Sequence, residues 1–409
     1  LQTDQNIDWL AGLLSLDTAS QRVLSLAAAV EIGTIDREVF AHIQRPARRD
    51  QALRVALGLD SDQAAAQATR RRSPLLRTGI LERACNDLAD VLKMTPIGSA
   101  LVTSRFKSVD DMAVRVLRPL KPSSADMVLH WPHLQDRSDL LAALMTNALA
   151  TKARGINLLL YGAPGTGKTE YAKQLVETVG AVGFEIDDKT DDEAPASRDQ
   201  RLGHLRLSEL FAPAGRSILL LDEAEDVFQV DYHSPLRGAM GEESDSKSWM
   251  NRVLEDNASP VVWISNKIDQ IDPAYLRRFT YCLEFPVMPL TVRREIARAH
   301  LAPAGCSDAF IDAMASHPNL SPALFSSAAR FVGLSRPRSS PDASRDPADA
   351  AARHILMGHL HAMGDKPMVA VPSSLTRFDM SYLHVQGGVQ PDEVVSTLQR
   401  VGKGTLLLG

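Results

Sequence analysis

The sequence has little of what marks several large classes of protein. It contains three cysteines in 409 residues, far apart and without metal-ligand spacing, which is typical of an intracellular chain in reduced form. No apolar run approaches the roughly 20 residues that span a membrane. No signal peptide opens the chain, and the zinc-peptidase pattern H-E-x-x-H is absent. We therefore expect a cytoplasmic protein with no membrane partner and no attached peptidase.

The charge of the chain argues against a general nucleic-acid binder. Its formal net charge is −5, and its basic clusters Arg48–Arg49 and Arg70–Arg72 have no interleaved aromatic residues that could stack on bases. We interpret both clusters as solvated surface. Nucleic-acid binding stays an alternative that the composition does not favour.

The apolar pattern divides the chain, and its length allows two to three domains. Residues 1–125, rich in leucine and alanine, predict a mainly helical N-terminal domain. Within it, the stretch 73–81 follows a helical run and looks like the start of a winged-helix wing. In residues 126–289 short apolar runs alternate with helical patterns, which predicts an α/β domain whose parallel sheet is flanked by helices. Residues 290–334 return to a helical pattern and predict a lid.

A glycine-rich segment of eight residues gives the first chemical signal. The segment 162–169, GAPGTGKT, fits the pattern G-x-x-x-x-G-K-[ST] and lies between a predicted strand and a predicted helix. Its glycines let backbone N–H groups converge on phosphate oxygens. Lys168 supplies a cation for the β- and γ-phosphates, and Thr169 offers a hydroxyl to Mg²⁺. The residues expected to bind ATP are Gly162, Ala163, Pro164, Gly165, Thr166, Gly167, Lys168 and Thr169.

Polar residues end two further predicted strands. Asp222 and Glu223 follow the apolar run 217–221, at the sheet edge where parallel sheets bind ligands. Asp222 can hold Mg²⁺, and Glu223 can activate a water molecule as general base. Asn266 follows the run 260–264, and a polar amide ending a buried strand needs a partner, here the γ-phosphate or the attacking water. The alternative for Asn266 is a residue that merely begins a turn.

Two adjacent arginines, Arg277 and Arg278, end a short helical pattern that begins near Asp272. Alone they could be surface charge. In a ring of subunits, their planar and always charged guanidinium groups could reach the γ-phosphate of the neighbour. We predict that they are arginine fingers, and the sequence does not choose between them.

In this order and spacing, the motifs resemble those of the AAA+ ATPases, and within them the AAA clade. Residues 162–169 resemble its Walker A motif, 218–223 its Walker B motif, Asn266 its sensor 1 and Arg277–Arg278 its paired arginine fingers. The resemblance covers about residues 142–332. It implies the fold of a P-loop NTPase with a helical lid, ATP and Mg²⁺ as ligands, and a homo-oligomeric ring. It also implies that ATP hydrolysis remodels a macromolecular partner, usually a protein.

The chain departs from the clade in one loop. Between the Walker motifs the clade usually carries an aromatic residue, an aliphatic residue and a glycine that grip the substrate. Residues 184–199 are acidic and contain no such triplet, which weakens the expectation that a polypeptide is threaded. One alternative to a remodelling motor is therefore a low-turnover, ATP-dependent switch or scaffold. Another is a DNA-associated ATPase that acts through its N-terminal domain, which resembles the winged-helix domains preceding some prokaryotic AAA modules.

The C-terminal residues predict a second module. Residues 335–349 are polar and rich in proline, as in a flexible linker, and a helical pattern follows them. Residues 404–409, GTLLLG, repeat the approach to the glycine-rich segment at 155–162. We therefore expect residues 350–409 to be a helical connector and the start of a second AAA module, as in a tandem bacterial ATPase. The alternative is a tail that ends in these letters by chance.

Overall fold

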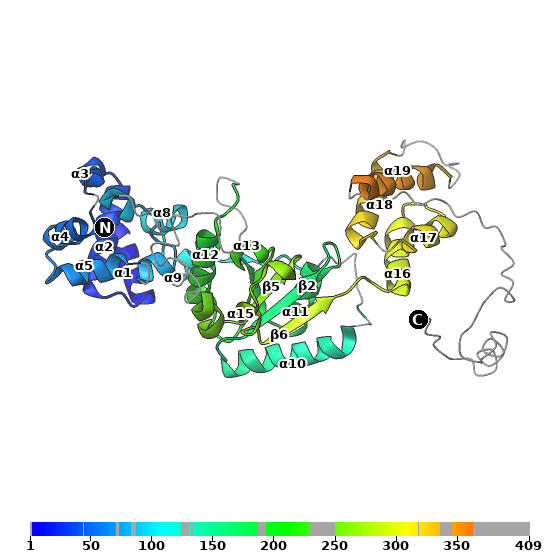
Figure 1. Cartoon of the computed structure of the whole chain (residues 1–409), viewed down its shortest axis with the longest axis horizontal. Helices are drawn as coiled ribbons and strands as arrows, with labels where there is room; N and C mark the ends of the chain where they lie inside the picture. Colours follow the sequence, from blue (N-terminus) through cyan, green and yellow to red (C-terminus); the bar gives the residue numbers. More distant parts are fainter. Residues whose placement is uncertain are drawn as a thin grey trace, which may run out of the picture. The chain divides into compact units, whose positions relative to one another are not determined.

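The structure is a computed structural model, and Figure 1 shows its helices and strands coloured along the sequence, from blue at the N-terminus to red at the C-terminus. It describes residues 2–43, 45–70, 73–82, 87–123, 131, 134–186, 194–228, 250–317, 319–335 and 346–362. Residues 1–356 pack as one compact unit. Of the expected second module, only the helical residues up to 362 belong to the described set. Part of the acidic stretch 184–199 also lies outside it.

The N-terminal part is helical, in agreement with its leucine and alanine pattern. Several helices begin where a Ser, Thr or Asp side chain accepts an N–H of the first turn, a cap worth about 1 kcal/mol each. These caps are Asp17, Ser61, Ser73, Asp87, Thr95 and Ser108. Apolar side chains such as Leu10, Leu24 and Leu53 bury together in one core. The helices are α1 (Gln2–Leu13), α2 (Thr18–Glu31), α3 (Glu38–Ala41), α4 (Pro46–Leu57), α5 (Asp62–Thr69), α6 (Pro74–Arg77), α7 (Leu88–Val91), α8 (Pro96–Thr103) and α9 (Val109–Val116).

The expected wing is a short helix followed by a single bridge. The stretch 73–81 contains α6 and ends at Leu81, which forms an isolated antiparallel bridge with Met94. Beside it, the backbone N–H of Glu82 donates to the carbonyl oxygen of Lys93 at 2.8 Å. Within residues 73–82 and 87–103 this is the extent of the β pairing. The winged-helix interpretation therefore stays a prediction.

The following residues form the predicted α/β domain around a six-stranded sheet. The strand order is β1-β3-β4-β5-β2-β6, and every neighbouring pair is parallel except the edge strand β1, which pairs antiparallel with β3. The strands are β1 (Arg118–Pro119), β2 (Asn157–Gly162), β3 (Val182–Glu185), β4 (Ser217–Leu221), β5 (Val261–Ser265) and β6 (Tyr281–Phe285). The helices are α10 (Gln135–Thr151), α11 (Lys168–Thr178), α12 (Arg198–Phe211), α13 (Glu225–Phe228) and α15 (Pro273–Leu276), with a 3₁₀ turn at Ile268–Gln270 and helical residues at 250–256.

The central strands are buried on both faces, which explains their continuous apolar runs. All of β4 and β5 is buried, and so are the first residues of β2. Alternate residues point to opposite faces, and one face of the sheet packs with Leu202 and Leu205 of α12. The order of strands places β5 between β2 and β4, so polar residues that follow these three strands lie in a row along one sheet edge.

A polar network fixes the other end of the sheet. The side chain of Asn157 at the start of β2 is fully buried. Its Nδ2 donates to the carbonyl oxygen of Leu254 at 2.6 Å and to Oδ1 of Asn257 at 3.0 Å. Its Oδ1 accepts from the indole N–H of Trp263 at 2.9 Å. Each of these buried groups would cost about 1–3 kcal/mol if left unpaired, so the network holds β2 and β5 in register.

Helix α12 belongs to two cores at once. Leu207 is buried with the helices of the N-terminal domain, while Leu202 and Leu205 are buried with the sheet. A Cβ on Gly203 would meet the backbone of Gly79 at 3.0 Å, so the absence of a side chain allows the two segments to touch. One face of α12 therefore packs on the N-terminal domain and another on the sheet.

Helices follow the sheet, as predicted. They are α16 (Leu290–Leu301), α17 (Asp308–Ala315), α18 (Pro322–Ser335) and α19 (Asp346–Ala362). The buried guanidinium of Arg293 in α16 donates to the carbonyl oxygens of Ala315 at 2.9 Å and Met288 at 2.6 Å. The helix α19 begins inside the stretch expected to be a linker. Its Asp349 accepts from the backbone N–H and the hydroxyl of Ser307, at 2.8 and 2.5 Å, which ties this helix to α17.

Candidate functional site

The first part of the site is the loop between β2 and α11. Gly162 and Gly165 have φ values of 143° and 74°, a region that L-residues rarely adopt. A Cβ on Gly162 would also lie 2.3 Å from the carbonyl oxygen of Phe285, and one on Gly165 would lie 2.7 Å from the side chain of Ser321. Both positions therefore require glycine. The loop leads directly into the first turn of α11, whose N–H groups lack partners within the helix.

Lys168, the first residue of α11, is buried beside this loop. Its Nζ donates to the carbonyl oxygens of Gly162 at 2.8 Å and Ala163 at 2.7 Å. Burial lowers the pKa of Lys168 to about 8, and the carboxylates of Asp222 and Glu225 oppose the shift. The lysine ammonium is thus close to both the glycine-rich loop and the acidic residues after β4.

The lowered pKa of Lys168 predicts how nucleotide affinity changes with pH. In the free protein this side chain loses its proton as pH rises through about 8. A bound phosphate would raise the pKa, because it favours the charged lysine. Affinity for Mg·ADP, measured by calorimetry, is therefore expected to be flat near neutral pH and to fall by up to about tenfold per pH unit above about 8. Constant affinity up to about pH 9.5 would contradict this assignment.

Thr169 and Asp222 join the two halves of the site. The Thr169 hydroxyl donates to Oδ2 of Asp222 at 2.7 Å. One group belongs to α11 and the other follows β4, although β5 separates β4 from β2. Oxygen ligands suit Mg²⁺, and two neighbouring ligands of an octahedral ion at about 2.1 Å lie about 3 Å apart. The two oxygens therefore fit a Mg²⁺ ion whose shell is completed by phosphate oxygens and water.

Glu223 and Asn266 lie at the same sheet edge. Glu223 is exposed, and its backbone N–H donates to Oδ1 of Asp222 at 2.8 Å. Asn266 directly follows β5, and its backbone N–H donates to Oε2 of the buried Glu225 at 3.3 Å. The backbone after β5 is thus bonded to a side chain of the segment that follows the acidic pair, and β4 and β5 are neighbouring strands.

The two arginines differ in their surroundings. Arg278 donates to Oε1 of Glu255 at 2.7 Å and to the carbonyl oxygen of Ala274 at 2.6 Å. Arg277 at the end of α15 is exposed, and its side chain makes no ion pair with another described residue. Arg277 is therefore exposed to solvent, whereas Arg278 is engaged within the chain.

Sequence reasoning missed the arginines of α12 that contact the loop after β4. Arg201 is buried and donates to the backbone carbonyl oxygens of Asp222 and Glu223. Arg198, one turn earlier, donates to the carbonyl oxygen of Val227 at 2.6 Å. The available signal was a pair of arginines at helical spacing in a segment that also buries leucines. Nothing in that spacing specifies the carbonyl groups that they bind.

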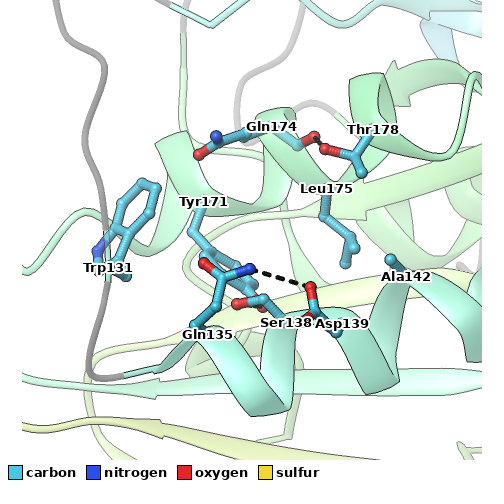
Figure 2. Close-up of a pocket in the computed structure, with 9 residues that line it drawn as sticks. All are labelled: Trp131, Gln135, Ser138, Asp139, Ala142, Tyr171, Gln174, Leu175 and Thr178. Atoms are coloured by element: carbon cyan, nitrogen blue, oxygen red, sulfur yellow. Dashed lines mark hydrogen bonds between the residues drawn. The ribbon is translucent and has the colours of Figure 1, made fainter.

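A shallow pocket lies beside the site, between α10 and α11 (Figure 2). The hydroxyl of Tyr171 donates to Oγ of Ser138 at 2.9 Å, which ties the two helices together. The rings of Trp131 and Tyr171 meet edge to face, with 5.3 Å between their centroids. Neither the acidic pair nor the lysine of the glycine-rich loop lines this pocket. Its contacts instead fix α11, which carries Lys168 and Thr169.

The residues that the structure describes bear on two questions, membrane crossing and metal binding. Of the helices assigned there, none has both the length and the apolarity needed to cross a bilayer. In the same part of the chain, no three His, Cys, Asp or Glu side chains gather as a metal cluster.

Comparisons with known proteins identify the domain. A family model described as "ATPase family associated with various cellular activities (AAA)" matches residues 158–287. The chain is 28% identical over 235 residues to an ATPase family AAA domain-containing protein 3A homolog of Drosophila melanogaster, covering 54% of this chain and 37% of that protein. It is 31% identical over 157 residues to a proteasome-activating nucleotidase of Saccharolobus islandicus, covering 35% and 38%. The chain thus spans less than two fifths of these relatives.

Among solved structures, the AAA domain of FIGL-1 in complex with ADP aligns with a TM-score of 0.43 at 14% identity. The alignment covers 64% of this chain and 97% of that one.

Proposed function

Because residues 158–287 of the chain are an AAA ATPase domain, we propose that it binds Mg·ATP and hydrolyses it within a homo-oligomeric ring. Hydrolysis would drive conformational remodelling of a macromolecular partner, which we take to be a protein. The observation that carries this proposal is the 2.7 Å contact between Thr169 and Asp222. It brings the phosphate-binding loop and the acidic pair to one point, which phosphoryl transfer to water requires.

Each residue has a chemical task in this proposal. The backbone N–H groups of residues 165–169 and the ammonium of Lys168 hold the phosphate oxygens. Thr169 and Asp222 would hold Mg²⁺, which would supply positive charge against the charge that develops on the transferring phosphoryl group. Glu223 accepts a proton from the attacking water, and the side-chain amide of Asn266 orients that water or the γ-phosphate.

The ring completes the site. Arg277 is exposed at the end of α15, and we propose that it reaches the γ-phosphate held by the neighbouring subunit. Arg278 steadies the turn through Glu255. The helical N-terminal domain, which we take to be winged-helix-like, would contact the partner, and its packing on α12 offers a path for the motion.

Steady-state turnover tests the proposed function. The chain, in the presence of Mg·ATP, is expected to release phosphate at about 1 s⁻¹ or faster, the lower range for common enzymes. Chelation of Mg²⁺ should abolish release, because Asp222 and Thr169 then lack the ion that neutralises the phosphates. Release that is independent of Mg²⁺ and of protein concentration would contradict hydrolysis in a ring.

A low-turnover switch is the second candidate. Residues 184–199 contain no triplet of an aromatic residue, an aliphatic residue and a glycine that could grip a polypeptide, which favours a protein that changes shape with nucleotide over one that threads a substrate. Tight ATP binding, together with phosphate release that stays slow when a candidate partner is added, would favour the switch over the motor.

A further inference from the structure

A buried arginine lies behind the turn that carries the acidic pair. Arg201 of α12 is 3% exposed. Its Nη1 donates to the carbonyl oxygen of Glu223 at 2.9 Å, and its Nη2 donates to the carbonyl oxygen of Asp222. The planar guanidinium fork thus binds two consecutive peptide groups of the loop from one side.

The backbone of that turn is strained. Glu223 has φ of 50°, in the left-handed region that disfavours residues other than glycine. Such a conformation persists only where the surroundings hold it, and it is found mainly at functional sites. Here Asp222 accepts the N–H of Glu223 at 2.8 Å, and the N–H of Ala224 donates to the carbonyl oxygen of Ile264 at 2.7 Å. Those contacts satisfy the N–H groups of the turn, and Arg201 satisfies its carbonyl oxygens.

The position of Arg201 is itself fixed. Leu202 and Leu205 of α12 are fully buried against the sheet, and Leu207 is fully buried in the core of the N-terminal domain. The helix therefore cannot shift its arginine without disturbing two cores. A group this rigid can hold a strained turn in one conformation.

We propose that Arg201 is a positioning residue for ATP hydrolysis, one that holds the Asp222–Glu223 turn so that the Glu223 carboxylate faces the attacking water. The inference rests on the proposed function. It assigns Arg201 no contact with nucleotide, so its loss should reduce the rate of the chemical step more than it reduces affinity. A lysine offers a point charge without the planar fork and should replace it only in part.

The test compares Arg201→Met and Arg201→Lys with the unchanged chain. Arg201→Met is expected to lower kcat by at least about tenfold, with Arg201→Lys between the two. Affinity for a fluorescent ADP derivative should change by less than about threefold. When Glu223 is already replaced by glutamine, adding Arg201→Met should lower the single-turnover rate by less than about threefold. The reason is that Arg201 acts through Glu223, so the effects of the two substitutions do not add.

A second measurement does not depend on catalysis. Hydrogen exchange of the peptide that contains residues 222–228 should become faster in Arg201→Met. The control is Arg206→Met, which removes another guanidinium of α12, one that is partly buried and bound to Glu209 and to the carbonyl oxygen of Arg252. It should lower Tm without changing kcat more than about twofold or the exchange of that peptide.

The outcomes separate the two proposals. If the unchanged chain hydrolyses ATP while Arg201→Met keeps its kcat, the positioning role is wrong and the proposed function stands. An equal loss of kcat in Arg206→Met would assign the effect to general destabilisation and also overturn the role. If the unchanged chain does not hydrolyse ATP, the proposed function fails, and unchanged exchange at residues 222–228 in Arg201→Met would overturn the structural premise as well.

Discussion

Replacing Glu223 by glutamine is expected to leave Mg·ATP bound and to slow its hydrolysis by about 10²–10⁴-fold. Glutamine has nearly the same size and cannot accept the proton of the attacking water. The backbone of residue 223 accepts a hydrogen bond from Arg201 through its carbonyl oxygen and donates one to Asp222 through its N–H. Neither bond involves the side chain that changes. The variant should therefore keep the turn and lose the base. Calorimetry with Mg·ATP and phosphate release measured on the same preparation check the two halves of this expectation.

A matched control lies three residues further along the chain. Asp226 is an exposed carboxylate of α13, and Asp226→Asn removes the same unit of charge without touching the site. Its kcat should stay within about twofold of the unchanged chain. Full hydrolysis in Glu223→Gln would show that another group is the base. An equal loss in both variants would assign the effect to the charge of the loop.

Removing the guanidinium of Arg277 is expected to have an effect at least as large. An arginine finger contributes about 10³–10⁵-fold to kcat, so Arg277→Ala should almost abolish hydrolysis while each subunit still binds ATP. Arg278→Ala should cost less in rate, because its guanidinium is occupied by Glu255 and the carbonyl oxygen of Ala274. Phosphate release measured at concentrations where the ring is assembled checks both variants.

Mixing two inactive variants tests whether the finger acts on the neighbour. An interface in which an Arg277→Ala subunit binds ATP and a Glu223→Gln subunit supplies Arg277 has all of its catalytic groups. In an equal mixture about a quarter of the interfaces are of this kind, so hydrolysis should return to a clear fraction of the unchanged rate. A mixture as inactive as its components, when the ring still assembles, would contradict action between subunits.

The strands that carry the site could be predicted because each is a continuous apolar run, followed by the glycine-rich loop after β2 and by polar residues after β4 and β5. The runs at β2, β4 and β5 are buried on both faces, and nothing interrupts them. The strands β3 and β6 gave no such signal. The strand β3 has only four residues, one of them Gly183, and the edge strand β6 alternates buried and exposed residues such as Leu283 and Cys282. A strand that is short, or that is covered on one face only, needs no continuous apolar run.

Contacts between distant residues could not be predicted from spacing. The sequence places Asn157 in an apolar run, and only the fold brings its amide to Trp263 and Asn257. Likewise, Arg201 lies 21 residues before Asp222, and nothing local indicates that its guanidinium binds two backbone carbonyl oxygens. The residues expected to touch nucleotide could be named from their motifs, whereas the residues that hold them in place could not.

The most direct test is calorimetry of Mg·ADP binding to the unchanged chain and to Lys168→Ala. If the loop at residues 162–169 and the acids at 222 and 223 form one nucleotide site, the unchanged chain should give a saturable heat with at most one nucleotide per subunit. Lys168→Ala should lose at least about 100-fold in affinity, the loss expected when a buried charge pair with phosphate is removed. No heat from the folded, unchanged chain, or equal affinity in both chains, would contradict the account.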